Sequence, residues 1–380
     1  MTDSIHIDSA SIVAVRLKEA RLRSGLSTRA VAEEIAKRFP QSPLSHATIA
    51  NYEKPGGASP PVNSIAMLAD VYEREVAWFL EKSQPLLGVR YRSLSSRVLV
   101  RERHQFETEA QHWLEGYLKI EQRLRKRLNG IHKIEASWRD LSPADLALAV
   151  RELWDYRDGD PIKSVVAIME GFGIRVIELR SAFRIDGLAA RFGSEYAVVL
   201  NPTSANDRGR MNAAHELGHV LYGDCSGSGA TTRAMDDRAF EFACCLLISN
   251  ENLKTVFSGR SAVLLAQAKE SYGISMAAMI YRAEKLKIID ARTTKKLWIQ
   301  FAKRGWRANE PGTVRPDRAI RLESMLDQAV FDRKLTWSEA AAMMGVSRSD
   351  LDERMRVAMG CQGISQDEPE GGSFNLRLHG

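Results

Sequence analysis

Residues 211–224 read MNAAHELGHVLYGD and hold two histidines four positions apart, with a glutamate directly after the first. On an α-helix, His215 and His219 lie on the same face one turn apart, so both imidazoles can reach one metal ion. Glu216 is rotated by one position and can accept a proton from a water that such an ion activates. Attack of that water on a peptide carbonyl would make the stretch a zinc peptidase helix. The alternative is a surface helix with two incidental histidines.

Three stretches upstream of this helix predict strands, because their β-branched residues are bounded by glycine, serine, asparagine and proline. They are GIRVIEL (173–179), DGLAARF (186–192) and EYAVVLNP (195–202). A small sheet beside the helix could bind an extended peptide as an added strand. The pattern therefore predicts an α+β arrangement that could place a peptide next to the two histidines.

A catalytic zinc site needs three protein ligands and leaves a further position open for water. The next predicted helix, TRAMDDRAFEFACCLLIS (232–249), offers three carboxylates. These candidates for the third ligand are Asp236, Asp237 and Glu241.

Residues 186–250 resemble the ImmA/IrrE metallopeptidase family through VVLNPTSANDRGRMNAAHELGHVL and RAFEFACCLLIS. The resemblance implies that His215 and His219 bind Zn²⁺ and that Glu216 is the catalytic base. In this family a Glu-x-x-Ala motif on the following helix supplies the third ligand, and matching its alanine to Ala239 places Asp236 at that glutamate. Aspartate is shorter by about one C–C bond, so the second helix must come closer to the first.

The first 82 residues predict short helices of a different kind. An apolar stripe of Val13, Leu17 and Ala20 ends at Gly25, and Ser27 or Thr28 can cap a second helix.

Ser45 can cap a third helix, HATIANYEK, in which Ile49 would be the buried anchor and Tyr52 would pack. Helix, turn and helix in this order can place the start of the third helix in the major groove of double-stranded DNA. The residues that we expect to face DNA are His46, Ala47, Thr48 and Asn51.

This part of the chain resembles the XRE (lambda-repressor-like) helix-turn-helix family. The resemblance runs through GLSTRAVAEEIA, SHATIANYEKP and PVNSIAMLADVYEREVAWFL, although the turn RFPQSPLS is longer than the family's usual one. It implies DNA binding, and the two half-sites that such domains read imply a homodimer. The alternative is a helical protein-interaction domain with the same fold.

Composition supports a cytoplasmic protein without a membrane partner. The chain has 380 residues, no apolar run of about 18 or more and no basic-then-apolar leader, and its four cysteines suggest no disulfide framework. A net charge of +6 permits contact with nucleic acid. The basic stretch from residue 92 to 131 is either a surface that faces DNA or a solvated helix flank.

We predict an α+β, mostly helical protein with a five-helix DNA-binding domain and a zincin-like domain that contains a small sheet. The predicted divisions are an XRE domain at 11–82, a helical connector at 87–160, a metallopeptidase domain at 161–310, a helical region at 311–365 and a disordered tail at 366–380.

The functional prediction is a transcriptional regulator whose zinc endopeptidase domain cleaves a repressor-type protein, as the resemblance implies. The alternative is a transcription factor whose peptidase domain no longer cuts and senses a ligand or a partner. Aspartate at position 236, where the family has glutamate, keeps this alternative open.

Overall fold

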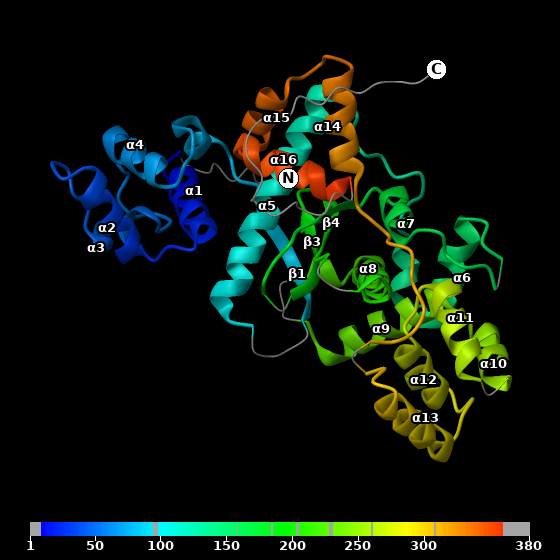
Figure 1. Cartoon of the computed structure of the whole chain (residues 1–380). Coiled ribbons are helices and arrows are strands. Elements are labelled where there is room, and N and C mark those ends of the chain that lie inside the picture. The colour runs from blue at the N-terminus through cyan, green and yellow to red at the C-terminus, as the bar shows by residue number, and fades with distance from the viewer. Residues whose placement is uncertain are drawn as a thin grey trace, which may run out of the picture. The chain divides into compact units, whose positions relative to one another are not determined.

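The computed structural model describes residues 9–93, 98–157, 159–183, 185–202, 205–227, 231–259, 261–307 and 309–359. Two compact units divide the chain, at residues 1–319 and 320–380. Helices dominate both, and a four-stranded sheet lies in the first (Figure 1), so the α+β, mostly helical class is confirmed. Residues 311–319, expected in the C-terminal helical region, belong to the first unit. The tail predicted at 366–380 falls outside the described residues.

The N-terminal region contains the five expected helices, the last of them a 3₁₀ helix. They are α1 (Ser9–Ser24), α2 (Thr28–Arg38), α3 (His46–Tyr52), α4 (Val62–Val71) and η1 (Val76–Leu80). The hydroxyl of Ser27 accepts a hydrogen bond from the amide of Ala30 and caps α2, while Ser45 caps α3 in the same way. Separate caps on both sides of the turn fix where each helix begins. A core of their own packs these helices together, with Leu17, Val31 and Ile49 fully buried in it.

Helix α5 (Val100–Leu124) joins these helices to the rest of the first unit through polar contacts. Arg16 of α1 is 2% exposed, and its guanidinium donates to Glu115 of α5 at 2.8 Å and to the carbonyl of Glu81 at 3.0 Å. The amide of Gln111, also on α5, donates to Glu19 of α1 at 2.8 Å. A buried charge is stable only when paired and hydrogen-bonded, so these contacts make α1 and α5 depend on one another.

The sheet consists of β1 (Leu86–Ser93), β2 (Arg175–Glu178), β3 (Ile185–Phe192) and β4 (Glu195–Leu200), in the order β1-β3-β4-β2. Strand β3 pairs antiparallel with β1 and β4, whereas β2 pairs parallel with β4. The three strands expected from the sequence are present.

Strand β1 lies at the start of the helical connector predicted at 87–160 and adds a strand to it, because residues of that stretch pair with β3. Its register with β3 shifts between Leu87 and Arg90, and Gly88 adopts a positive φ of 57°. A Cβ at Gly88 would lie 2.0 Å from the carbonyl oxygen of Cys225, so only glycine fits there. This irregularity interrupts the alternation of apolar and polar residues at Leu87 and Gly88, and the alternation resumes only from Val89 to Arg92.

Helices α8 (Asn206–Leu221) and α9 (Arg233–Leu247) pack on one another beside the sheet, and the short η3 (Asp224–Ser226) follows α8. Gly218 permits the close approach of the two long helices. A Cβ at this position would lie 3.0 Å from Cδ1 of Phe242 and 3.2 Å from Cα of Ala239.

We expect Gly218→Val to lower the free energy of unfolding by about 1–3 kcal/mol, because the added methyl groups overpack the interface between α8 and α9. Urea denaturation measures the change. Gly209→Ala is the matched control on α8, since a Cβ there meets nothing within 4 Å, and it should keep or raise the free energy of unfolding. Equal stability of the two variant chains would contradict a tight interface at Gly218.

The remaining helices of the first unit cover the core around α8. They are η2 (Ala136–Asp140), α6 (Pro143–Leu153), α7 (Val165–Gly171), α10 (Asn250–Ser258), α11 (Ala262–Tyr272), α12 (Met276–Lys285) and α13 (Ala291–Lys303). The second unit contains α14 (Arg321–Phe331), α15 (Trp337–Met344) and α16 (Arg348–Ala358). Within the described part of the chain, no helix is both long enough and apolar enough to cross a membrane.

Candidate metal centre

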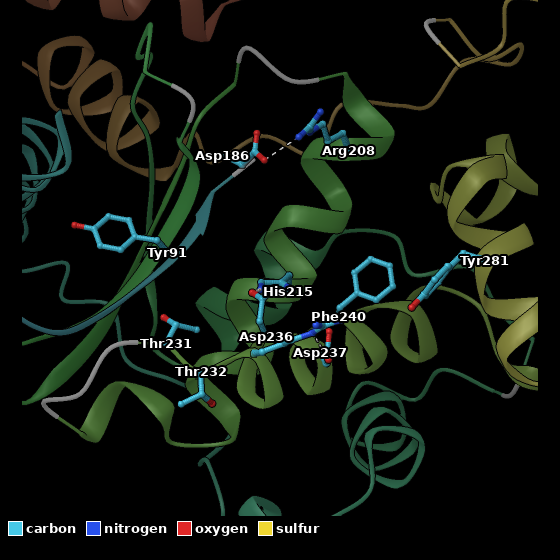
Figure 2. A pocket seen from close by; sticks show the side chains of 11 residues that line it. Tyr91, Asp186, Arg208, His215, Thr231, Thr232, Asp236, Asp237, Phe240 and Tyr281 are labelled. Carbon is cyan, nitrogen blue, oxygen red and sulfur yellow. Dashed lines mark hydrogen bonds and ion pairs between the residues drawn. The ribbon is translucent and has the colours of Figure 1, made fainter. Parts of the chain in front are cut away.

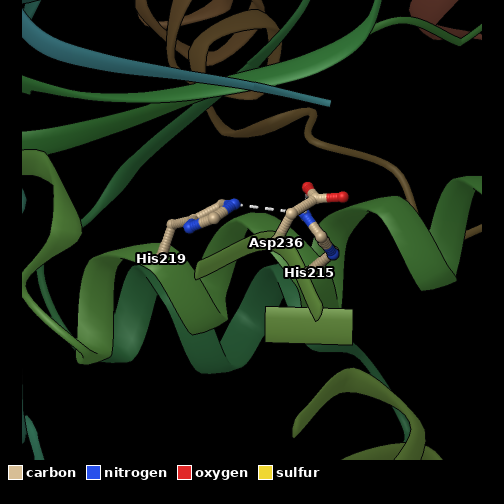
Figure 3. Close-up of side chains that lie close together, drawn as sticks. All are labelled: His215, His219 and Asp236. Carbon is tan, nitrogen blue, oxygen red and sulfur yellow. Dashed lines mark hydrogen bonds and ion pairs between the residues drawn. The ribbon is translucent and has the colours of Figure 1, made fainter. Parts of the chain in front are cut away.

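The two motif histidines lie side by side on the inner face of α8. His215 and His219 are 1% and 0% exposed, and their Nε2 atoms are 3.1 Å apart (Figure 3). Two imidazole nitrogens so close together in the interior suit a shared cation. The structure therefore brings the two imidazoles together on one face of α8.

Asp236 of α9 is the carboxylate that joins them. Its Oδ1 lies 3.1 Å from Nε2 of His215, and the three candidate ligand atoms all lie within 4.8 Å of one another. Asp237 is paired instead with Arg233, and Glu241 with Lys285. Of the three carboxylates that the sequence left open, the structure brings only Asp236 to the histidines.

This donor set fits zinc. Donor atoms about 2.0–2.1 Å from one tetrahedral zinc ion are roughly 3.3 Å from each other. Two of the three separations here are 3.1 Å, and the third, between His219 and Asp236, is within 4.8 Å. Two imidazoles and one carboxylate are also the ligand types of catalytic zinc sites that keep a position open for water. The close approach at Gly218 brings α9 near enough for the short side chain of Asp236 to reach His215.

Glu216 lies between α8 and the sheet. Its side chain is 0% exposed, and a Cβ built on Gly187 of β3 would lie 3.5 Å from its Oε1. That distance is an ordinary van der Waals contact, so the carboxylate packs directly against β3 at Gly187. Glu216 thus follows the first histidine on α8 without joining the three-residue cluster.

A residue that the sequence did not single out orients the second histidine. Oδ2 of Asp224 lies 2.8 Å from Nδ1 of His219, and both side chains are buried. A carboxylate at the far ring nitrogen fixes the orientation of an imidazole and leaves its Nε2 available to a metal. The signal in the sequence is weak, because Asp224 follows the end of α8 and a left-handed turn at Gly223 brings it back.

Two arginines hold Asp224 in turn. Nη2 of Arg238 donates to its Oδ1 at 2.9 Å, and Nε of Arg90 donates to its backbone carbonyl at 2.9 Å. Arg90 belongs to β1, so the strand that the sequence did not predict helps to position the metal centre. Arg90 and Arg238 thus hold Asp224 in place, and Asp224 in turn orients His219.

We expect Asp224→Asn to weaken zinc affinity by roughly 10–100-fold, because the neutral amide no longer stabilises the orientation and basicity of His219. Competition with a chelating indicator measures the affinity. Asp140→Asn is a control carboxylate outside the cluster, and it should bind zinc as the wild-type chain does. Wild-type affinity in Asp224→Asn would show that the contact with His219 has no part in metal binding.

The cluster opens into a cleft of about 680 Å³. Tyr91 of β1 lies on one flank, Phe240 and Tyr281 lie on the other, and His215 and Asp236 lie between them (Figure 2). The remaining lining residues are polar: Asp186, Arg208, Thr231, Thr232, Arg233 and Asp237. A cleft of this volume, with the buried His215 and the exposed Asp236 at its base, has room for an extended peptide segment.

The residues expected to face DNA lie on the accessible side of α3. His46, Ala47 and Asn51 are exposed, and Thr48 is half-buried with its hydroxyl 2.8 Å from that of Ser45. Ile49 and Tyr52 are buried, in agreement with their predicted packing roles. The exposure is compatible with DNA contact, which stays a prediction.

A family model described as the IrrE N-terminal-like domain, Peptidase_M78, matches residues 169–284. No curated protein and no solved structure matches the chain. The matched segment contains β2 to β4, α8 and α9, and so the whole His215, His219 and Asp236 cluster. The N-terminal helices lie outside it. Residues 169–284 are therefore similar to the zincin-like, metallopeptidase-type domains of the IrrE N-terminal-like family.

Proposed function

We propose that the chain is a DNA-binding transcriptional regulator with a zinc-dependent endopeptidase domain that cleaves a repressor-type protein. The observation that carries the peptidase assignment is the convergence of His215, His219 and Asp236 at the base of the cleft, with Glu216 buried beside them. The similarity of residues 169–284 to a metallopeptidase family supports the same reaction class.

Each residue of the cluster has a distinct part in this reaction. His215, His219 and Asp236 would hold zinc, which supplies a Lewis acid toward a water and a peptide carbonyl. Glu216 accepts a proton from the attacking water and can return it to the leaving amine. Asp224 keeps His219 oriented through its Nδ1. The sheet edge beside α8 is the place where an extended substrate could add as a strand.

The direct test compares new protein N-termini in cells that produce the wild-type chain with those in cells that produce Glu216→Gln. Cleavage products confined to the wild-type cells, together with bound zinc in the purified chain, support the proposal. The cleaved protein would be identified in the same experiment, and this chain itself is one candidate. Identical N-termini in both cell populations would refute the peptidase function.

A second candidate is a regulator that senses a ligand or partner without cutting. It is favoured by the aspartate at the third position, whose side chain is 52% exposed at the base of the cleft. Regulation of target genes separates the two candidates. Gene regulation that is unchanged by Glu216→Gln supports the sensor, whereas loss of regulation together with loss of cleavage supports the peptidase.

DNA reading by α3 is the other half of the proposal. We expect Asn51→Ala to weaken binding to DNA selected by the full chain from a random-sequence pool by roughly five- to hundredfold, since an asparagine can pair with the edge of an adenine. Fluorescence anisotropy measures the affinity. Gln122→Ala, an exposed change on α5, is the control and should bind as wild type does. Failure of the wild-type chain to select any sequence would contradict the assignment of α3 as the reading helix.

A further inference from the structure

A second cavity lies beside the aromatic flank of the cleft, where the start of α6 meets α9 and α12. Its volume is about 140 Å³. Apolar groups make up much of its lining, from Pro143, Ala144, Phe240, Cys244, Tyr281 and Leu286. None of these residues belongs to the metal cluster.

The polar groups inside this cavity already have hydrogen-bond partners. Arg282 donates to the carbonyl oxygens of Cys244 and Ile248 and to the side chain of Asn250, at 2.7, 2.5 and 2.5 Å. Burial raises the pKa of the Cys245 thiol, so this group is uncharged at neutral pH. Inside the cavity, a guest would therefore meet a neutral thiol and an arginine whose donors are already used in hydrogen bonds.

The charged pair at this site is Glu241 and Lys285, whose side chains are 39% and 47% exposed. They pair with one another at the solvent side of the cavity. A charged guest would thus lose its hydration inside the cavity and would have to compete with an existing ion pair, whereas an apolar guest would only displace water.

Two rings form a wall that this cavity shares with the cleft. Phe240 and Tyr281 line both, and their centroids lie 6.0 Å apart at 77° (Figure 2). Phe240 follows Asp236 by one turn of α9, a rise of about 6 Å, which matches roughly two residues of an extended peptide. Consider a peptide that lies in the cleft and extends past Phe240 and Tyr281. A side chain that this peptide carries next to the two rings could reach the cavity.

We propose that this cavity is a specificity pocket that receives one large, uncharged apolar side chain of the peptide substrate. The residue concerned lies within about two positions of the bond held at the metal cluster. At about 30 Å³ for each water-sized group, 140 Å³ takes four to five such groups, the size of a leucine or methionine side chain. The inference rests on the proposed peptidase function for its biological meaning, but the binding itself does not require cleavage.

The test measures binding of N-acetyl-L-leucinamide and of N-acetyl-L-aspartic acid α-amide, whose side-chain carboxylate is free, to the zinc-loaded full chain by saturation-transfer NMR. The leucine compound is expected to bind at least about tenfold more tightly, because its side chain leaves water on binding. Ala144→Trp fills the cavity from an exposed position on α6 and should abolish this preference. Leu148→Trp, one turn later on α6 and 47% exposed, is the matched control and should leave the preference intact.

A second variant, Tyr281→Ala, removes a wall at a residue that is 52% exposed and should reduce the preference at least about fivefold. Circular dichroism and bound zinc confirm that each variant is folded. Equal binding of the two compounds, or an undiminished preference in folded Ala144→Trp, would overturn the pocket. A clear leucine preference in a chain that cleaves nothing would refute the peptidase function alone, so the two failures are distinguishable.

Discussion

A Glu216→Gln chain is expected to keep its zinc and to lose roughly 10²–10⁴-fold of its peptide-bond hydrolysis, the usual contribution of a general base. The carboxylate lies outside the group of three side chains that could hold the metal, so the neutral amide should leave that group intact. Glutamine has nearly the same shape, and Gly187 leaves space for it beside β3. The change therefore removes a proton acceptor with little disturbance of the packing.

Hydrolysis of the cleaved target, or of a peptide that spans its cleavage site, measures this loss, and elemental analysis measures zinc in the same samples. Asp237→Asn is a suitable control because its carboxylate pairs with Arg233 at the rim of the cleft. Undiminished hydrolysis by a zinc-loaded Glu216→Gln chain would exclude Glu216 as the base. Loss of zinc from that chain would instead make it a structural support of the metal centre.

Replacing Asp236 by alanine should lower zinc affinity by more than about 100-fold, since even residues that only orient a ligand contribute 10–100-fold. The neighbouring Asp237→Ala has the same chemistry one position away and should bind zinc as the wild-type chain does. Equilibrium dialysis against a series of free zinc concentrations compares the two. This pair of variants is well matched, because both side chains are exposed and lie in the first turns of α9.

The opposite result, with zinc lost from Asp237→Ala and retained by Asp236→Ala, would identify Asp237 as the third metal ligand. Retention by both chains would mean that His215 and His219 hold the ion without either aspartate. His219→Ala provides the reference for complete loss, because it removes one of the two buried imidazoles.

The sequence predicts the parts of this site that depend on local periodicity. A spacing of four residues places His215 and His219 on one helical face, and β2 to β4 follow from their β-branched runs and turn residues. Helix starts at Ser27 and Ser45 are equally local, because a cap is defined by its own side chain and the next three residues. These features need no knowledge of distant contacts.

The third carboxylate could not be chosen in this way. Asp236, Asp237 and Glu241 all lie on α9, and the rotation of that helix about its axis depends on packing at Gly218 and Ala239. The contact of Asp224 with His219 could not be predicted for a similar reason, since it depends on a turn after the end of α8. Such contacts become visible only when the chain is folded.

The buried contact of Arg16 with Glu115 bears on attempts to separate the N-terminal helices from the rest of the chain. Removal of the first 82 residues would take away both Arg16 and Glu19. Glu115 and Gln111 of α5 would then lose these hydrogen-bond partners and be exposed on the remaining fragment. Cutting the chain after α5 would break a different contact, because Arg175 of β2 pairs with Glu121 of α5 at 2.6 Å and both side chains are buried. The N-terminal helices, α5 and the sheet are therefore linked in series by buried ion pairs, and any exchange of the N-terminal helices must keep a partner for Glu115.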